Sequence, residues 1–135
     1  MLVRVLVVDD FETFRQFTHR ALAKCPNLVI CEVADGLHAV HKAKELQPDL
    51  ILLDVGLPTL NGVEAARQIR KLAPKSKIIF VTQEPSVEVV QQALDMGAWG
   101  YVLKARAATD LQAAVEAVLE GKRFISAGVS NSGFN

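Results

Sequence analysis

Leu50-Ile51-Leu52-Leu53-Asp54, residues 50–54, is a run of four large aliphatic side chains that ends in a carboxylate. Three other apolar runs also end in a side chain that can bind a charged group. They are Val5–Val8 before Asp9 and Asp10, Ile78–Val81 before Thr82, and Tyr101–Leu103 before Lys104. Short, continuously apolar runs are typical of strands that are buried on both faces of a parallel sheet. Since parallel strands align their carboxyl ends, we expect three carboxylates, a hydroxyl and an ammonium to converge in one crevice.

Around these runs the chain alternates strand patterns with helical patterns five times. The expected strands are Val3–Val8, Leu28–Val33, Leu50–Leu53, Ile78–Val81 and Gly100–Leu103. The segments that follow them carry apolar residues at helical spacing, as Val63, Ala66 and Ile69 do. Strand–helix alternation with crossovers of this length implies a parallel sheet with right-handed connections. The sequence therefore predicts an α/β fold, a doubly wound five-stranded parallel sheet with five helices on its two faces.

The composition indicates a globular domain without an excess of either charge. The chain has 135 residues, half of them apolar, and its 15 Lys and Arg residues equal its 15 Asp and Glu residues. This length suits one domain, and balanced charge gives no reason to expect nucleic acid binding by this segment. No apolar run approaches the roughly 18 residues that span a membrane, and the N-terminus does not have the pattern of a signal peptide. Because Cys25 and Cys31 have neither zinc-site nor redox-motif spacing, we expect reduced cysteines and a cytoplasmic protein.

The end of the chain has a different character. Gly121 ends the last helical pattern, and residues 122–135 are mostly small and polar and show no periodicity. We therefore expect one domain over residues 1–121 and a linker or tail over residues 122–135.

Asp9, Asp10 and Asp54 together predict a cation site. Each of them alone could be an ordinary strand-end or helix-capping aspartate. Three carboxylates within about 5 Å would repel one another by roughly 3 kcal/mol per pair at an effective dielectric of about 20, so the fold needs a compensating charge. A divalent cation supplies that charge, and oxygen-only ligands favour Mg²⁺ with several retained waters. Lys104 adds one more positive charge.

Asp54 could serve as more than a metal ligand. A carboxylate can attack a phosphorus atom whose oxygens are held by a metal and a lysine, and the product is an aspartyl phosphate. Gly56 lies in the short loop after Asp54 and lets the backbone approach closely, so its carbonyl could complete the metal shell. Thr82 suits any buried strand, but its hydroxyl could instead donate to a phosphoryl oxygen.

At these positions the chain resembles the receiver domain of two-component response regulators. That family has a CheY-like, flavodoxin-like fold with strand order 2-1-3-4-5. The resemblance covers about residues 3 to 121 and rests on an ordered set of motifs at the expected strand ends. The motifs are Val7-Val8-Asp9-Asp10-Phe11, Pro48-Asp49-Leu50-Ile51-Leu52-Leu53-Asp54, Leu57-Pro58 with Gly62, Thr82, and Gly97-Ala98 through Gly100-Tyr101 to Lys104.

The resemblance implies a phosphorylation site that depends on a metal. Asp54 is similar to the phosphoacceptor of the family, which takes a phosphoryl group from a histidine of a sensor kinase or a phosphotransfer protein. Asp9 and Asp10 are similar to the acidic pair that holds Mg²⁺, together with Asp54 and the carbonyl of Gly56. The protein would then be no enzyme beyond catalysing its own phosphorylation and dephosphorylation.

The resemblance also implies a conformational switch. Lys104 is similar to the lysine that contacts the phosphoryl group, and Thr82 to the hydroxyl that moves toward it. Tyr101 matches the aromatic residue whose ring turns inward as that hydroxyl shifts. Such a change would be reported at the protein surface, and it allows a homodimer to form on phosphorylation.

Two positions depart from the commonest pattern of the family. Gln83 follows Thr82 where a small residue is usual, and a longer side chain there could narrow access to Asp54. Ala105 follows Lys104 where proline is usual, which leaves the geometry of that peptide bond open.

The end of the domain resembles receivers that are attached to a NarL/FixJ-type helix-turn-helix domain. The stretch from Gly97 to Lys104 and the ending Glu120–Ser126 carry that resemblance. We therefore expect control of transcription through a DNA-binding output domain beyond residue 135, with no DNA contact by this segment. A single-domain receiver that acts by protein–protein contact is the alternative.

Two other classes of protein share parts of this pattern. A haloacid-dehalogenase-type phosphatase also uses an aspartyl phosphate, but it needs an Asp-x-Asp motif after the first strand, where this chain has Asp9-Asp10. A flavodoxin-like flavin binder needs a hydroxyl- and glycine-rich phosphate loop at the same place, where this chain has Asp-Asp-Phe-Glu.

Overall fold

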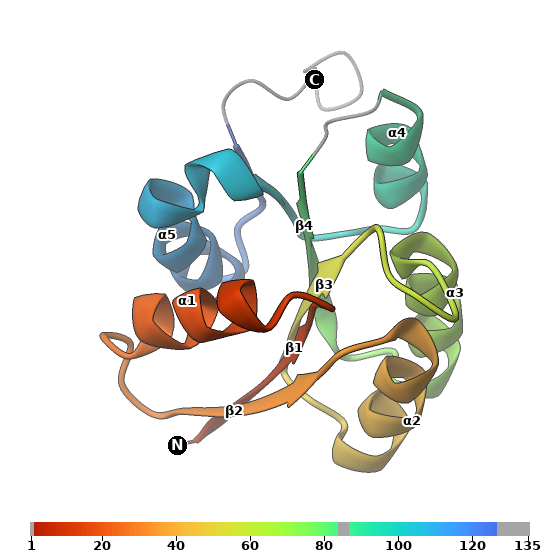
Figure 1. The fold of residues 1–135 in the computed structure, drawn as a ribbon, viewed down its shortest axis with the longest axis horizontal. Coiled ribbons are helices and arrows are strands. Elements are labelled where there is room, and N and C mark those ends of the chain that lie inside the picture. Colours follow the sequence, from red (N-terminus) through yellow and green to blue (C-terminus); the bar gives the residue numbers. More distant parts are fainter. Residues whose placement is uncertain (1, 84–86, 127–135) are drawn as a thin grey trace.

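The computed structural model describes residues 2–83 and 87–126, and these form a parallel sheet between two layers of helices (Figure 1). The strands are β1 (Val3–Val8), β2 (Leu28–Val33), β3 (Leu50–Asp54), β4 (Lys77–Thr82), β5 (Gly100–Leu103) and β6 (Phe124–Ile125). The helices are α1 (Glu12–Leu22), α2 (Gly36–Leu46), α3 (Gly62–Leu72), α4 (Val87–Asp95) and α5 (Ala107–Leu119). A 3-10 turn, η1 (Lys104–Arg106), joins β5 to α5.

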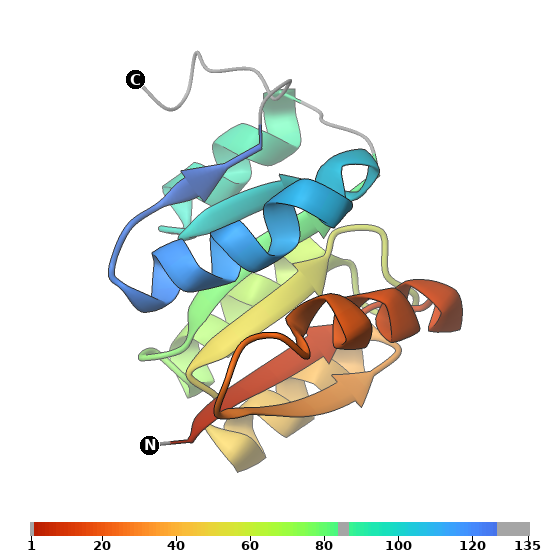
Figure 2. The same ribbon diagram turned by 90° about the vertical axis from the view of Figure 1, so that its left-hand side faces the viewer.

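The sheet has the order β2-β1-β3-β4-β5-β6, and each neighbouring pair is parallel (Figure 2). Helices α1 and α5 cover one face, and α2, α3 and α4 cover the other (Figure 1). The predicted doubly wound core of five strands in the order 2-1-3-4-5, with five helices, is confirmed. Strand β2 lies on one side of β1 in the sheet, and β3 and the later strands lie on the other side of β1. The carboxyl ends of β1 and β3 therefore flank the point where ligands bind in sheets of this kind.

The sheet divides the core into two layers because successive strand residues point to opposite faces. In β1, Val5 and Val7 belong to the layer under α1 and α5. Leu6 and Val8 belong to the layer under α2, α3 and α4. All four side chains are buried, which explains why the run is apolar without interruption.

The loop between β3 and α3 is held close to the end of β3. The Gly62 N–H donates to the Val55 carbonyl at 2.8 Å, and a Cβ at Gly62 would collide with the carbonyl of Asp54. Asn61 caps α3 by accepting the N–H of Glu64 at 2.9 Å. Glycine at position 62 therefore lets helix α3 begin against the strand that carries Asp54.

Strand β6 was not predicted from the sequence. It pairs with β5, and the flanking N–H groups of Phe124 and Ser126 donate to the carbonyls of Trp99 and Tyr101 at 3.1 and 2.9 Å. Part of the segment predicted as a linker or tail is thus docked on the sheet, while residues 127–135 lie outside the described residues. Two residues are too few to show a strand period, and their pairing depends on the edge of β5.

Candidate functional site

The predicted strand-end residues meet at the carboxyl edge of the sheet. Asp9 directly follows β1, Asp54 ends β3, and Thr82 ends β4. Carboxylate oxygens of Asp9, Asp10 and Asp54 lie within 4.8 Å of one another. The parallel register places Val8 beside Leu53, so the next residue of each strand, Asp9 and Asp54, also become neighbours.

Lys104 reaches this cluster from the far end of β5. Its Nζ lies 2.8 Å from Oδ2 of Asp9 and 3.4 Å from Oδ2 of Asp54. Its side chain is only 8% exposed. One ammonium therefore bridges two carboxylates and is itself largely shielded from water.

The environment of Asp54 disfavours its negative charge. Burial raises the pKa of Asp54 and the neighbouring charge of Asp9 raises it further, against the opposing effects of Lys104 and of the Gly56 N–H. That N–H is 3.4 Å from Oδ1 of Asp54, which is a long hydrogen bond. Three carboxylates face a single ammonium, so an added cation would stabilise the ionised cluster.

The donor set fits a hard divalent cation. Asp10 is exposed, whereas Asp9 and Asp54 are buried, so the oxygens form a site with one open side. The Phe11 N–H and Lys104 Nζ each donate to one oxygen of Asp9, which fixes its carboxylate plane. Oxygen donors with access for retained water are what Mg²⁺ requires. Gly56 is exposed, and an added Cβ there would meet nothing within 4 Å, so its side of the loop is open.

The residues predicted as a switch are both buried. Thr82 is 6% exposed at the end of β4, next to the strand that ends in Asp54. Tyr101 lies in β5 with its ring 6.3 Å from that of Phe80, and burial raises the pKa of Tyr101 to about 12, with the Thr82 hydroxyl partly opposing that rise. The Tyr101 hydroxyl makes no well-formed hydrogen bond among the described residues, so the Thr82 contact that opposes the rise is a weak one.

The two departures from the family pattern have simple structural settings. Gln83 is exposed immediately after β4, where its side chain can reach solvent. Ala105 lies in η1, and the peptide bond between Lys104 and Ala105 is trans.

The start of α1 supplies contacts that sequence reasoning missed. Arg15 Nη1 donates to the carbonyl of Asp9 at 2.7 Å, and its Nε lies 3.3 Å from a carboxylate oxygen of Glu32. The rings of Phe11 and Phe14 lie beside the ammonium of Lys104. A signal was present in the sequence, since Phe11, Phe14 and Arg15 all fall within five residues of Asp10.

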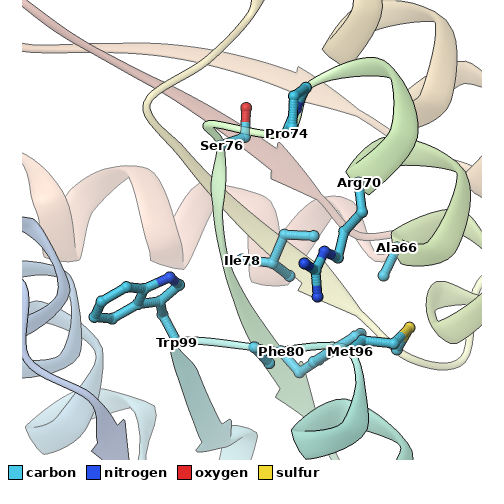
Figure 3. Close-up of a pocket in the computed structure, with 10 residues that line it drawn as sticks. Ala66, Arg70, Pro74, Ser76, Ile78, Phe80, Met96 and Trp99 are labelled. Atoms are coloured by element: carbon cyan, nitrogen blue, oxygen red, sulfur yellow. The ribbon is translucent and has the colours of Figure 1, made fainter.

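A separate cavity of about 60 Å³ lies at a distance from this cluster, between α3, β4 and the loop after α4 (Figure 3). It is lined by apolar side chains such as Ile78, Met96 and Trp99, with the guanidinium of Arg70 directed toward Gly97. None of the acidic residues, Thr82 or Lys104 lines it. The cavity is therefore no part of the candidate site.

Comparison with known proteins agrees with this arrangement. Residues 5–116 match the family model of the response regulator receiver domain. The chain therefore belongs to the family of response regulator receiver domains, which sets aside the phosphatase and flavin-binding alternatives.

Three relatives illustrate the match. The chain is 38% identical over 123 residues to the response regulator protein VraR from Staphylococcus epidermidis, a match that covers 90% of this chain and 59% of VraR. It is 33% identical over 131 residues to the transcriptional regulatory protein DegU from Brevibacillus brevis, covering 96% of this chain and 56% of DegU. The crystal structure of a LuxR-family two-component response regulator from Aurantimonas sp. SI85-9A1 is 30% identical with a TM-score of 0.90, covering 98% of this chain and 96% of that chain.

The chain spans 59% of VraR and 56% of DegU, so these relatives extend beyond the matched domain. The named relatives are regulators of two-component systems or of transcription. Over residues 2–83 and 87–126, none of the helices has the length and apolar character needed to cross a lipid bilayer.

Proposed function

We propose that this domain accepts a phosphoryl group on Asp54 from a phosphohistidine of a sensor kinase or a phosphotransfer protein. The observation that carries the proposal is the cluster of Asp9, Asp10 and Asp54 oxygens within 4.8 Å, with Lys104 Nζ against two of the three carboxylates. In this cluster Asp54 is buried and poorly compensated, and Asp10 is open to solvent.

In the proposed reaction an oxygen of Asp54 attacks the phosphorus atom and forms the new P–O bond. The P–N bond to the donor histidine breaks, its electron pair stays on the imidazole nitrogen, and that nitrogen takes a proton from solvent. Lys104 moves from the carboxylate oxygens to the transferred phosphoryl oxygens, whose charge it can neutralise. Asp9, Asp10, Asp54 and the carbonyl of Gly56 would hold a Mg²⁺ ion, which would supply the remaining positive charge. The domain would carry out this transfer and the later hydrolysis on itself, without turnover of another substrate.

The proposed output is a shift between two arrangements of Thr82 and Tyr101. Thr82 ends the strand beside Asp54, so its hydroxyl can donate to a phosphoryl oxygen placed there. Tyr101 faces the same core layer as Phe80, and its buried hydroxyl lies near that of Thr82 without a well-formed hydrogen bond. A ligand that binds one arrangement better shifts the population toward it. Because DegU is named as a transcriptional regulator, we propose control of transcription in the cytoplasm through a DNA-binding domain of a longer protein, with homodimer formation on phosphorylation.

The direct test is phosphorylation with a small donor. Protein incubated with Mg²⁺ and acetyl phosphate should gain one phosphoryl group by intact-mass spectrometry, and hydroxylamine should remove it as it removes acyl phosphates. Asp54→Asn should carry no label, because the attacking carboxylate is gone. Asp95→Asn, at an exposed carboxylate of α4, is the matched control and should label as the wild type does. Undiminished labelling of Asp54→Asn would refute the assignment.

A further inference from the structure

Lys104 is enclosed on two sides of different character. Asp9 and Asp54 lie on one side, at 2.8 and 3.4 Å from its Nζ. On the other side, Nζ lies 4.6 Å from the ring centroid of Phe14 and 5.3 Å from that of Phe11. The contacts to the two rings account for part of the low exposure of the lysine side chain.

Phe11 occupies a position that local helix chemistry does not favour. It is the N-cap of α1, where Ser, Thr, Asp or Asn would satisfy an N–H of the first turn, and it makes no side-chain cap hydrogen bond. The residue is also 54% exposed. A large apolar residue at this position forgoes a cap hydrogen bond and exposes apolar surface to water. Its presence indicates a role outside the stability of the helix.

Phe14 is one turn further along α1, so the two rings face the same side of the helix. Its ring lies 5.5 Å from that of Phe17, which packs in the core layer beneath α1 and α5. Phe17 packs toward the core, while the rings in contact with Lys104 are those of Phe11 and Phe14.

We propose that Phe11 and Phe14 are positioning residues that hold the ammonium of Lys104 against Asp54 by cation–π contact. This inference rests on the proposed phosphoryl transfer for its consequence and on the ring contacts for its geometry. A lysine ammonium is a point charge on a flexible stem, so its position depends on what surrounds it. Ring faces attract a cation without offering hydrogen-bond acceptors, so every N–H of Lys104 stays available to oxygen.

The same contact suits the transfer step. Lys104 must change partners, from carboxylate oxygens in the free domain to phosphoryl oxygens after the P–O bond forms. A cation over a ring face is held by the whole face and not by a single acceptor atom, so the ammonium can make a small move across the faces while it remains within about 6 Å of both rings. A hydrogen-bonding group in their place would hold the lysine to one position.

The first measurement is made on the free protein and does not depend on phosphorylation. Protons on Cε of Lys104 should show an upfield ring-current shift in a ¹H–¹³C NMR spectrum of the wild type. The shift should be largely lost in the double variant Phe11→Leu and Phe14→Leu. It should remain in the single variant Phe14→Tyr, which keeps an aromatic ring at this position. It should also remain in Phe17→Leu, a matched control on the same helix. An unchanged shift in the double variant would overturn the positioning role.

The second measurement is the rate of phosphorylation by acetyl phosphate at saturating Mg²⁺, a small donor that needs no protein docking surface. The double variant should be slower by about two- to tenfold, the range expected from losing one or two such contacts. Phe14→Tyr and Phe17→Leu should stay within about twofold of wild type. Normal rates in the double variant, with its circular dichroism spectrum unchanged, would also overturn the inference. If the wild type takes no label while the ring-current shifts behave as described, the proposed function fails and the positioning of Lys104 stands.

Discussion

Asp54 and Asp110 are both buried carboxylates, 6% and 8% exposed, yet their environments act on them in opposite directions. Burial raises the pKa of Asp54, and the nearby charge of Asp9 adds to that rise. Burial also tends to raise the pKa of Asp110, but hydrogen bonds from Ser126, Arg106 and Thr109 outweigh it and leave that pKa lowered. Solvent exposure alone therefore does not separate the two sites.

The difference lies in the donors directed at each charge. Asp110 accepts from Ser126 Oγ at 2.7 Å, from Arg106 Nε at 3.1 Å and from Thr109 Oγ1 at 3.1 Å. Asp54 has Lys104 Nζ and the Gly56 N–H, both at 3.4 Å. The saturated carboxylate is suited to holding structure together, and the poorly compensated one is suited to binding a further cation or forming a bond.

The saturated cluster also ties the end of the described chain to the sheet. Ser126 is 1% exposed, and its Oγ accepts the N–H of Leu103 at 3.1 Å while it donates to Asp110. Leu103 is the residue before Lys104. Strand β5 therefore connects the two clusters. Leu103, its last residue, binds Ser126 of the Asp110 cluster, and Lys104, the next residue, reaches the Asp54 cluster.

The largest expected difference between the clusters is in metal affinity. Asp10→Asn should weaken Mg²⁺ binding by on the order of a hundredfold, since losing a direct ligand costs at least as much as losing one of its supporting partners. Asp110→Asn should stay within about twofold of wild type, because its carboxylate is already satisfied by three donors of the protein. Isothermal titration calorimetry or amide shifts near Asp9 and Asp54 would measure both affinities. Equal affinities in Asp10→Asn and the wild type would contradict the metal site.

The next largest difference is in stability. Asp110→Ala should lower the free energy of unfolding by about 2 kcal/mol, because it removes charge-assisted hydrogen bonds and leaves the buried Ser126 hydroxyl without its acceptor. Urea denaturation at neutral pH without metal would measure this loss. Ser126→Ala in the same background should cost much less than it does in the wild type, since the partner of its hydroxyl is already gone. Independent, additive losses would show that the Ser126–Asp110 bond does not anchor β6.

The two clusters also differ in how far the sequence predicted them. Asp9, Asp54, Thr82 and Lys104 each follow an apolar strand, and the rule that parallel strands align their carboxyl ends was enough to predict their convergence. The burial of Asp110 could not be predicted in this way. It lies on α5, where an acidic residue ordinarily faces solvent, and its carboxylate is bound by Ser126, the residue that directly follows the short strand β6.

The contacts of Lys104 with Phe11 and Phe14 were missed for a related reason. Helical periodicity assigns Phe14 to the apolar stripe of α1, together with Phe17, and its half-buried ring does belong partly to that core layer. Periodicity predicts which face of a helix is buried. It does not predict that the ring also borders Lys104, which lies 90 residues later in the chain, directly after β5.

The smallest expected effect is a difference in how stability depends on pH. The folded-state pKa of Asp54 is raised above the ordinary value of 3.8, so its ionisation destabilises the native state as pH rises through that pKa. Without metal, Asp54→Asn should therefore be more stable than wild type at pH 7. We expect a difference of about 1 kcal/mol, because burial and the charge of Asp9 outweigh the attraction of Lys104. This gap should close as pH falls toward 3.8, where the wild-type carboxyl becomes neutral.

Asp110 should behave in the opposite way. Its folded-state pKa is lowered, so its contribution to stability is present above 3.8 and is lost only as pH falls below that value through the folded-state pKa. Between pH 7 and about 4, the gap between wild type and Asp54→Asn should shrink while the gap between wild type and Asp110→Asn stays constant. Urea denaturation of the three proteins across this range would measure both gaps. Gaps that change in parallel would mean that the two buried carboxylates are equally well satisfied, and the contrast between a reactive cluster and a structural one would not hold.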